Sequence, residues 1–366
     1  MFLSPRLGLS YLAPQQAQKH VTVNETFRKL DALVQTAATS ATVSTEPNTP
    51  AEGETYILPA TASGAAWSGF AEGSLAVFQD GAWAEINPAT GMLAFVSDVA
   101  SVFAFDGTVW TAVTGRPQLT APTTFHVDPV AGSDTSSGLA AGSDAFRTIQ
   151  AAIDRIASID LSVHDVTIQL APGVYTEGAT VSGPWIGSGQ VSLIGDPDNP
   201  AATRIEPTVD HCLTTTGVGA RLHVDGLELI APDGTALFAI DGSLLEFDNI
   251  IFGACDNRHI RAYGARISGK RSNYQIKGGA IAHISAENMG QVDVFDATIE
   301  IINTPNFSSA FIAALIMSLV TASSLSFTGS ATGRHYRGDR NSIMSTGGVT
   351  LPGNQSGTLS SGAQFL

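Results

Sequence analysis

Charged residues are scarce in this sequence: Asp, Glu, Lys and Arg make up 14% of its 366 residues, where about a quarter is usual in globular proteins. The surface must therefore be covered largely by Ser, Thr, Asn, Gly and backbone. Such a surface is typical of β-rich extracellular or virion proteins and disfavours a helical cytosolic enzyme. Glycine is abundant, at 37 residues, which indicates frequent tight turns.

Cysteine is also scarce. Cys212 and Cys255 are the only two, so the chain cannot build a disulfide framework or a zinc site with the usual ligand spacing. Each lies inside an apolar run, which predicts two buried thiols that fill a core.

Positive charge and long apolar runs are lacking as well. The chain has 18 Lys and Arg against 33 Asp and Glu, for a net charge of −15, which disfavours nucleic acid or an anionic membrane as a partner. The longest apolar run, residues 311–320, is about half of what a membrane span needs; it predicts a buried segment, with a subunit interface as the alternative. The N-terminus lacks the apolar stretch of a secretory signal. We therefore expect a virion protein, assembled in the bacterial cytoplasm and released by lysis.

The N-terminal third divides by composition into two parts. Residues 1–39 form an expected attachment segment: residues 1–22 are irregular, and a helix begins at Asn24, a good N-cap, and ends near Ala38. Phe27, Leu30 and Val34 then share one helix face.

Residues 40–114 form an expected small β-rich adaptor domain. It contains two similar stretches with Asp-Gly pairs at Asp80 and Asp106, which predict hairpin turns. Trp83 and Trp110 follow these turns as core or interface aromatics, with sugar stacking as the alternative. Residues 115–124 have the composition of a linker.

Short motifs recur in the rest of the chain at a step near 24 residues. Their second positions are Asp225, Asp248, Ser272 and Asp296. Each unit carries two or three alternating apolar runs separated by turn residues, so it cannot bury its apolar face alone and must stack on its neighbours. This pattern predicts a parallel β-helix over residues 125–330, with five to seven coils and a C-terminal cap at 331–366. An amphipathic helix at 146–156, with Phe146, Ile149, Ile153 and Ile156 on one face, would cover its N-terminal end.

Several segments resemble known families. Residues 125–139 (FHVDPVAGSDTSSGL) and 145–154 (AFRTIQAAID) resemble the entry motif of pectin-lyase-like proteins, whose fold is a right-handed parallel β-helix. Residues 166–176 (VTIQLAPGVYT), 329–336 (GSATGRHY) and 351–354 (LPGN) are similar to β-helical phage tail and fibre proteins. The resemblance implies a mainly β chain: a small N-terminal helix and β-domain, then the capped β-helix.

A second resemblance covers residues 3–112. Residues 4–9 (SPRLGL), 11–25 (YLAPQQAQKHVTVNE) and 30–33 (LDAL) resemble an N-terminal module of alphaproteobacterial prophages and gene transfer agents. In that family the module accompanies fibre or spike proteins. The resemblance implies a fibre or spike on a phage-like particle, on either the head or the tail. It also implies a homotrimer, docked on a virion base, capsid-vertex or baseplate protein, that attaches to capsular polysaccharide of the recipient cell.

Catalytic chemistry is not evident in the sequence. Asp225, Asp248 and Asp296 precede turn residues, so we expect them to bond local backbone rather than to act as an acid/base pair. No catalytic residue, cofactor or metal site is predicted, although a capsular polysaccharide depolymerase, a lyase or glycoside hydrolase on the same scaffold, remains the alternative.

One stretch reverses the sign of the overall charge. Six cations lie between positions 258 and 277, with His259 and two tyrosines among them. If the coils stack, these side chains are expected to gather on one flank and bind an anionic polysaccharide through Arg forks and Tyr faces. The alternative is a solvated face balanced by neighbouring carboxylates or by another subunit. The candidate ligand-binding residues are Arg258, Arg261, Tyr263, Arg266, Lys270, Arg271 and Tyr274.

Overall fold

The computed structural model describes residues 19–113 and 115–366, with side chains from residue 23 onward. The chain divides into two compact units at Gly115 and Arg116. It is mainly β, with 45% of residues in strands and 8% in helices, as the composition predicted. Most of the segment expected to be irregular, residues 1–22, lies outside the described residues.

The first unit combines one helix with two small sheets. Strand β1 pairs in parallel with β5, and β5, β6 and β7 continue antiparallel, while β2, β3 and β4 form a second antiparallel sheet. The elements are α1 (Lys19–Leu33), β1 (Ala37–Ala38), β2 (Thr55–Ile57), the short 3₁₀ helix η1 (Trp67–Gly69), β3 (Leu75–Gln79), β4 (Ala82–Ile86), β5 (Leu93–Val96), β6 (Ser101–Phe105) and β7 (Trp110–Ala112).

The helix differs from its prediction in position and in orientation. It begins five residues before Asn24 and ends at Leu33 rather than near Ala38, where the chain turns at Gln35 with φ 51° and enters β1. The face that packs on the sheets carries Asp31 and Ala32, both 0% exposed. The apolar stripe is left outside, since Leu30 is 44% exposed and Val34 is 38% exposed. Ala32 and Ala38 share a core cluster with β3 and β5, so the end of the helix packs on the sheets of the first unit.

The two Asp-Gly turns and the tryptophans follow the prediction. Asp80 (φ 52°) and Gly81 (φ 78°) join β3 to β4 as a two-residue hairpin, which requires positive φ at both positions. Trp83 packs edge-on against Trp67, with ring centroids 5.2 Å apart. Trp110 donates its indole N–H to the carbonyl oxygen of Gly73 at 2.7 Å. Both rings are half-buried in the cores of this unit.

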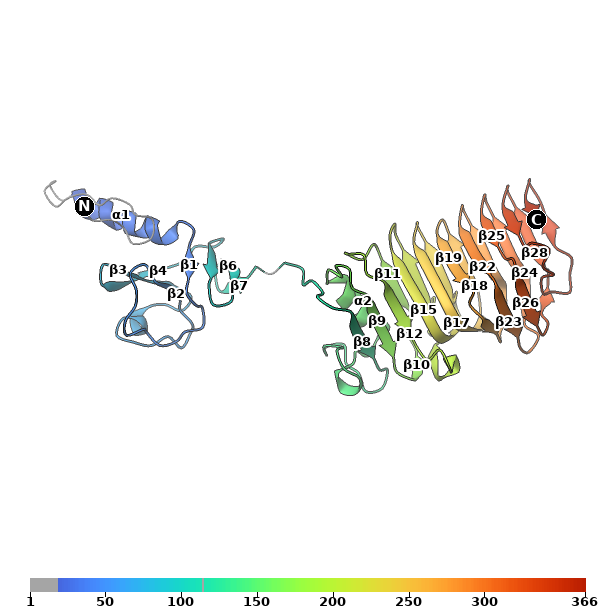
Figure 1. The fold of residues 1–366 in the computed structure, drawn as a ribbon, viewed down its shortest axis with the longest axis horizontal. Helices are drawn as coiled ribbons and strands as arrows, with labels where there is room; N and C mark the ends of the chain where they lie inside the picture. Colours follow the sequence, from blue (N-terminus) through green and yellow to red (C-terminus); the bar gives the residue numbers. More distant parts are fainter. Residues whose placement is uncertain (1–18, 114) are drawn as a thin grey trace. The chain divides into compact units, whose positions relative to one another are not determined.

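The second unit is a parallel β-solenoid of about eight turns (Figure 1). Each complete coil runs over three faces, named A, B and C in chain order, and every strand pairs in parallel with its counterparts in the coils before and after. Face A holds β8 (Thr123–Val127), β9 (Val166–Leu170), β12 (Val191–Ile194), the first half of β15 (Arg221–Ala231), the first half of β17 (Leu244–Cys255), β19 (Arg266–Lys270), β22 (Gln291–Phe295), β25 (Leu319–Thr321), β29 (Ile343–Ser345) and β31 (Gln364–Phe365).

Face B is formed by the second halves of β15 and β17, which turn a corner without ending. Its other strands are β10 (Gly173–Tyr175), β13 (Thr203–Ile205), β20 (Tyr274–Ile276), β23 (Ala297–Ile301) and β26 (Leu325–Thr328). Face C is a separate sheet of β11 (Ala179–Ser182), β14 (Leu213–Thr216), β16 (Leu237–Ile240), β18 (Arg258–Tyr263), β21 (Ala280–Glu287), β24 (Asn306–Leu315), β27 (Thr332–Gly333), β28 (Tyr336–Asp339) and β30 (Thr358–Leu359).

Helix α2 (Ile149–Ala157) packs against β8 and β11 at the first coil. It begins three residues later than predicted, because Thr148 is its N-cap and accepts a hydrogen bond from Ala151 N at 3.2 Å. Phe146, Ile149, Ile153 and Ile156 are all buried, as their spacing predicted. Two short 3₁₀ helices, η2 (Gly142–Asp144) and η3 (Pro200–Ala202), lie in loops.

The stack continues farther than expected. Where a cap was expected from residue 331 onward, β28 pairs with β24 and β29 pairs with β25. Strand β30 then adds a further layer on face C, and β31 adds one on face A. One core runs through the whole solenoid and includes both thiols, Cys212 and Cys255, which are free and buried as predicted. The apolar run 311–320 contributes Phe311, Ile312, Ala314 and Val320 to this core, whereas Met317 is 59% exposed.

Candidate functional site

The cations of residues 258–277 do not gather on one flank, contrary to the sequence prediction. Arg258, Arg261 and Tyr263 lie on β18 of face C, whereas Arg266 and Lys270 lie on β19 of face A. Arg271 lies at the corner after β19, in the left-handed region with φ 57°. The chain turns a solenoid corner within the basic run, so residues that are close in sequence point in different directions.

Tyr274 is also misplaced by the prediction, because it is 4% exposed and lies in the core. Its hydroxyl is 2.8 Å from Nε2 of His283, and Nδ1 of His283 is 3.0 Å from Nδ1 of His259. Phe252 and Phe307 pack around the two imidazoles. This buried Tyr–His–His chain stabilises the interior and leaves no tyrosine face for a sugar ring at this position.

The face A cations have partners in adjacent coils. The Arg266 guanidinium lies 2.7 Å from Asp293 Oδ2, and Arg271 Nε lies 3.9 Å from Asp296 Oδ2. Lys270 places its ammonium 5.6 Å from the centre of the Phe295 ring. This part of the basic run is a face balanced by neighbouring carboxylates, which was the alternative interpretation of the sequence.

On face C, Arg258 and Arg261 share one carboxylate. Arg258 Nη2 is 3.0 Å from Glu287 Oε1, and Arg261 Nη2 is 2.8 Å from Glu287 Oε2. Ser285 donates its hydroxyl to the same carboxylate at 2.8 Å. Burial raises the pKa of Glu287, but the Arg261 hydrogen bond and the two positive charges outweigh it and hold that pKa below its ordinary value. The side chain is thus an anion fixed on the outer surface of the sheet.

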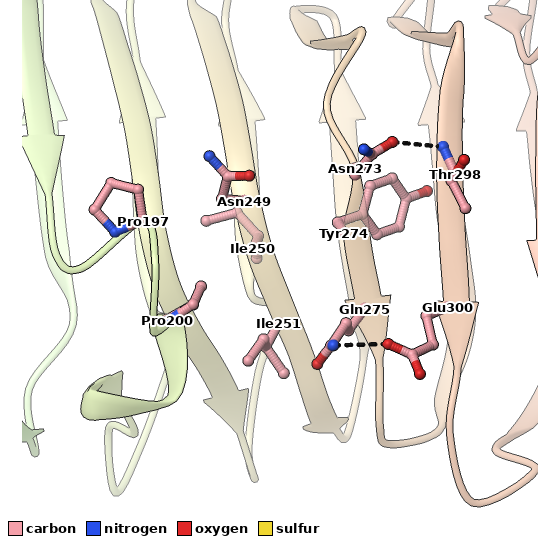
Figure 2. Close-up of a pocket in the computed structure, with 10 residues that line it drawn as sticks. All are labelled: Pro197, Pro200, Asn249, Ile250, Ile251, Asn273, Tyr274, Gln275, Thr298 and Glu300. Atoms are coloured by element: carbon pink, nitrogen blue, oxygen red, sulfur yellow. Dashed lines mark hydrogen bonds between the residues drawn. The ribbon is translucent and has the colours of Figure 1, made fainter.

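A hollow on face B of the solenoid is lined by both apolar and polar side chains (Figure 2). It has a volume of 280 Å³, at the lower end for ligand pockets. Its floor comes from three successive coils, β17, β20 and β23, and its wall comes from the loop after β12. The lining residues are Pro197, Pro200, Asn249, Ile250, Ile251, Asn273, Tyr274, Gln275, Thr298 and Glu300.

This face B groove combines an apolar floor with amide and carboxylate groups. Gln275 donates from Nε2 to Glu300 Oε2 at 2.7 Å, and Asn273 Oδ1 accepts from the backbone N of Thr298, also at 2.7 Å (Figure 2). Ile251, Gln275 and Glu300 are register partners on adjacent strands, so their side chains form an outward row. Side-chain amides and carboxylates with nonpolar surface beneath them suit hydroxyl groups and C–H faces of sugars.

A third cluster lies on face A around His223. Its Nε2 is 3.0 Å from Asp248 Oδ2, and this hydrogen bond raises the pKa of His223 above its ordinary value against the effect of burial. The charges of Asp248, Asp225 and Glu246 act in the same direction. An imidazole whose pKa is raised by neighbouring carboxylates can serve as a general acid in its protonated form.

The carboxylates in this cluster differ from the prediction in their bonding. Asp225 and Asp248 are register partners, as their 23-residue step predicted. However, Asp225 Oδ1 accepts from the side-chain amide of Asn249 at 2.9 Å, and Asp248 bonds His223, so both carboxylates bond adjacent coils rather than local backbone. The turn itself is made by the residues that follow, Gly226 (φ 69°) and Asn249 (φ 48°).

Sequence reasoning missed the groove residues Asn249, Asn273, Gln275 and Glu300. Their spacings of 24 and 25 residues, between Asn249 and Asn273 and between Gln275 and Glu300, were available as a signal. In the described part of the chain, no group of three or more His, Cys, Asp or Glu side chains is placed to hold a metal ion. No helix among those residues is long and apolar enough to cross a membrane.

Comparison with known proteins gives a match in the first unit. Residues 23–111 match a family model described as "Protein of unknown function (DUF2793)". No curated protein and no solved structure matches the chain. The chain therefore carries a DUF2793 domain at its N-terminus, followed by a β-solenoid of about eight turns.

Proposed function

We propose that this protein is a fibre or spike of a phage-like particle or gene transfer agent and that it attaches the particle to polysaccharide on the recipient cell. The first unit docks on a particle protein, and the solenoid carries the glycan-binding surface. The observation that carries the proposal is the face B groove, an apolar floor with an outward row of Gln275 and Glu300 on a stacked, rigid scaffold.

Three further observations support this proposal. A solenoid of parallel coils presents side chains at a regular interval of about 4.8 Å, which suits a repeating polymer. The low charge content agrees with a surface exposed outside the cell. The sequence of the first unit also resembles a module that accompanies fibres and spikes.

Binding to polysaccharide can be tested with groove variants. Purified recipient polysaccharide would be immobilised and the binding of the full chain followed by biolayer interferometry. Gln275→Ala and Glu300→Gln remove donors and charge at the groove, and we expect each to weaken binding about fivefold to twentyfold, the loss of one or two hydrogen bonds. Gln190→Ala is the matched control, since Gln190 is exposed in an earlier coil and bonds Val166 and Asp165 through its backbone.

Two results would contradict the proposal. One is wild-type protein that fails to bind any recipient polysaccharide, and the other is groove variants that bind as tightly as Gln190→Ala. Mass spectrometry of purified particles tests the location independently, because a fibre or spike must be present there in stoichiometric amounts.

The His223 cluster favours a second candidate, a capsular polysaccharide depolymerase. The His223 imidazole, 3.0 Å from Asp248, and the carboxylates of Asp248 and its register partner Asp225 are candidate acid and base groups on face A. Incubation of the protein with polysaccharide, followed by assays for reducing ends and unsaturated products, separates the two functions. Products that disappear with Asp248→Asn would favour the enzyme.

A further inference from the structure

Face C carries a row of small outward residues between two strands that bear arginines. We call this row the trough, and the sequence did not reveal it. Arg261, Ser285, Ala313 and Arg337 are register partners on the successive strands β18, β21, β24 and β28. Ser285 and Ala313 point outward, since their neighbours Ile284, Ala286, Ile312 and Ala314 belong to the core. Two long arginines thus flank a floor of small side chains.

The floor of the trough is covered by those longer side chains. Ser285 is 0% exposed and Ala313 is 2% exposed, although both lie on the outer surface of the sheet. Small outward residues can be this buried only when neighbouring side chains lie over them. The ends of the row are three strand spacings apart, about 14 Å, so arginines from the two ends can approach each other above the floor.

Charge in the trough is strongly one-sided. Arg258 and Arg261 share Glu287, as described above. Arg334 and Arg337 are exposed, and within the described residues neither has a carboxylate within ion-pair distance. Burial lowers the pKa of Arg258 against the effect of the Glu287 charge, and the charges of Arg261 and Arg337 lower it further. Arg337 is therefore close enough to Arg258 for their charges to interact. Among these four guanidiniums, the only carboxylate within ion-pair distance in the described residues is Glu287, in a chain whose net charge is −15.

A hollow of 440 Å³ lies beside the exposed pair. Hydroxyl groups line it together with the two guanidiniums, and aromatic rings are absent from its lining. The lining residues are Ile281, Ser308, Ser309, Arg334, Arg337 and Thr358. Guanidinium forks and hydroxyl donors form the donor set that binds planar or tetrahedral oxyanions.

We infer that this trough is a second binding site, separate from the face B groove, for the carboxylate or sulfate groups of an acidic sugar chain. Glu287 is a resident anion that occupies the inner arginine pair, and Arg334 and Arg337 form the open outer pair. Phosphate groups of a nucleic acid are a poorer fit, because the strongly negative chain repels an extended polyanion and the hollow lacks a ring on which bases could stack.

Binding of defined probes to the full chain tests the inference. The probes are a labelled four-sugar oligo-uronate, a neutral oligoglucose of equal length, inorganic sulfate and a single-stranded DNA of twelve nucleotides. We expect the oligo-uronate to bind, sulfate to compete with it, and the oligoglucose and the DNA to bind at least tenfold more weakly.

Substitutions then locate the site. Arg334→Gln with Arg337→Gln should weaken oligo-uronate binding about tenfold or more. The matched control is Arg340→Gln, an exposed arginine of the same coil whose Nε lies 3.6 Å from Asp339 and which does not line the hollow. Glu287→Gln should strengthen binding several-fold, because it removes the competing anion, a gain that misfolding would not produce.

Clear results would overturn the inference. They are an absence of oligo-uronate binding at millimolar concentration, equal losses in the double variant and in Arg340→Gln, or DNA binding as tight as oligo-uronate binding. If Glu287→Gln lacks the wild-type circular dichroism spectrum, the comparison of the double variant with Arg340→Gln decides alone. The arginine double variant changes face C alone and Gln275→Ala changes face B alone, so failure at one surface is distinguishable from failure at the other.

Discussion

Acidification should destabilise the solenoid from within, through its buried histidines. His259 and His283 are both 0% exposed, and burial lowers the pKa of each imidazole, that of His259 from 6.5 to about 3. The positive charge on one ring would further disfavour protonation of the other. Both rings are therefore neutral in the fold at pH 5, where imidazoles of the unfolded chain are mostly protonated.

The sign and size of the effect follow from this difference. A group whose folded pKa is lowered binds its proton more readily in the unfolded chain, so its stability is fully present above pH 6.5 and is lost as the pH falls. A pH of 5 lies 1.5 units below the pKa of the unfolded imidazole, so His259 lowers the free energy of unfolding by about 2 kcal/mol relative to pH 7. This figure does not depend on the folded value as long as that value stays well below 5. His283 adds to the loss in the same direction.

Urea unfolding followed by circular dichroism at pH 7 and at pH 5 measures the loss. The informative variant is His259→Phe combined with His283→Phe, which should be less stable at pH 7 but lose less stability between the two pH values. Phe307→Leu is the control, since it removes packing from the same cluster and no titrating group. An equal loss between pH 7 and pH 5 in the wild type and in the double variant would refute the reasoning.

Three further outcomes are expected. Thr148→Ala removes the N-cap of α2 and should lower the free energy of unfolding by about 1 kcal/mol, measured by urea unfolding. Both thiols should resist a thiol reagent at pH 8 in the folded protein and react on unfolding, because burial raises the pKa of Cys255 to about 12 and that of Cys212 well above its ordinary value. The homotrimer that the resemblance implies stays a prediction, and we expect the exposed Leu30 of α1 to contribute to its association. Leu30→Glu should then reduce the trimer fraction in sedimentation velocity, whereas Lys29→Glu on the same helix should not.

The sequence predicted the solenoid because the step between the first two motifs equals the length of one coil. Asp225 and Asp248 are register partners, as their step predicted, and Phe247 and Phe252 alternate into the core. The fourth motif slips by one position: Tyr274 pairs with Ile299, so Asp296 aligns with Arg271 rather than with Ser272. Arg271 and Asp296 have the left-handed backbone of the corner, with φ of 57° and 55°. The gain at a corner lies one coil earlier: β17 pairs with β19 at an offset of 22 residues but with β20 at an offset of 24, so two residues are added between them. The strands stay paired, and a simple period does not reveal the insertion.

The candidate site was less predictable, because alternation tells inward from outward but does not tell which of three faces a residue occupies. Arg258 and Lys270 are close in sequence but lie on different sheets. Arg337 is 79 positions after Arg258, and the two charges interact although strands β21 and β24 lie between their strands. Tyr274 was expected outside because it lies among cations. Its inward position is set by the strand register with Ile299, a core residue.

The corner between faces A and B has a consequence for how such a chain diversifies. Nine residues, 195–203, separate the paired positions Ile194 on face A and Arg204 on face B. In the next coil only two residues, 226 and 227, separate their partners Asp225 and Glu228. The longer connection supplies Pro197 and Pro200 to the wall of the groove (Figure 2), while β12 and β13 keep their pairing with β15. Corner loops can therefore lengthen, shorten or be exchanged between lineages without breaking the ladder beneath them. On the proposed attachment function, specificity for a new host surface can evolve by exchange of corner loops, while the scaffold stays unchanged.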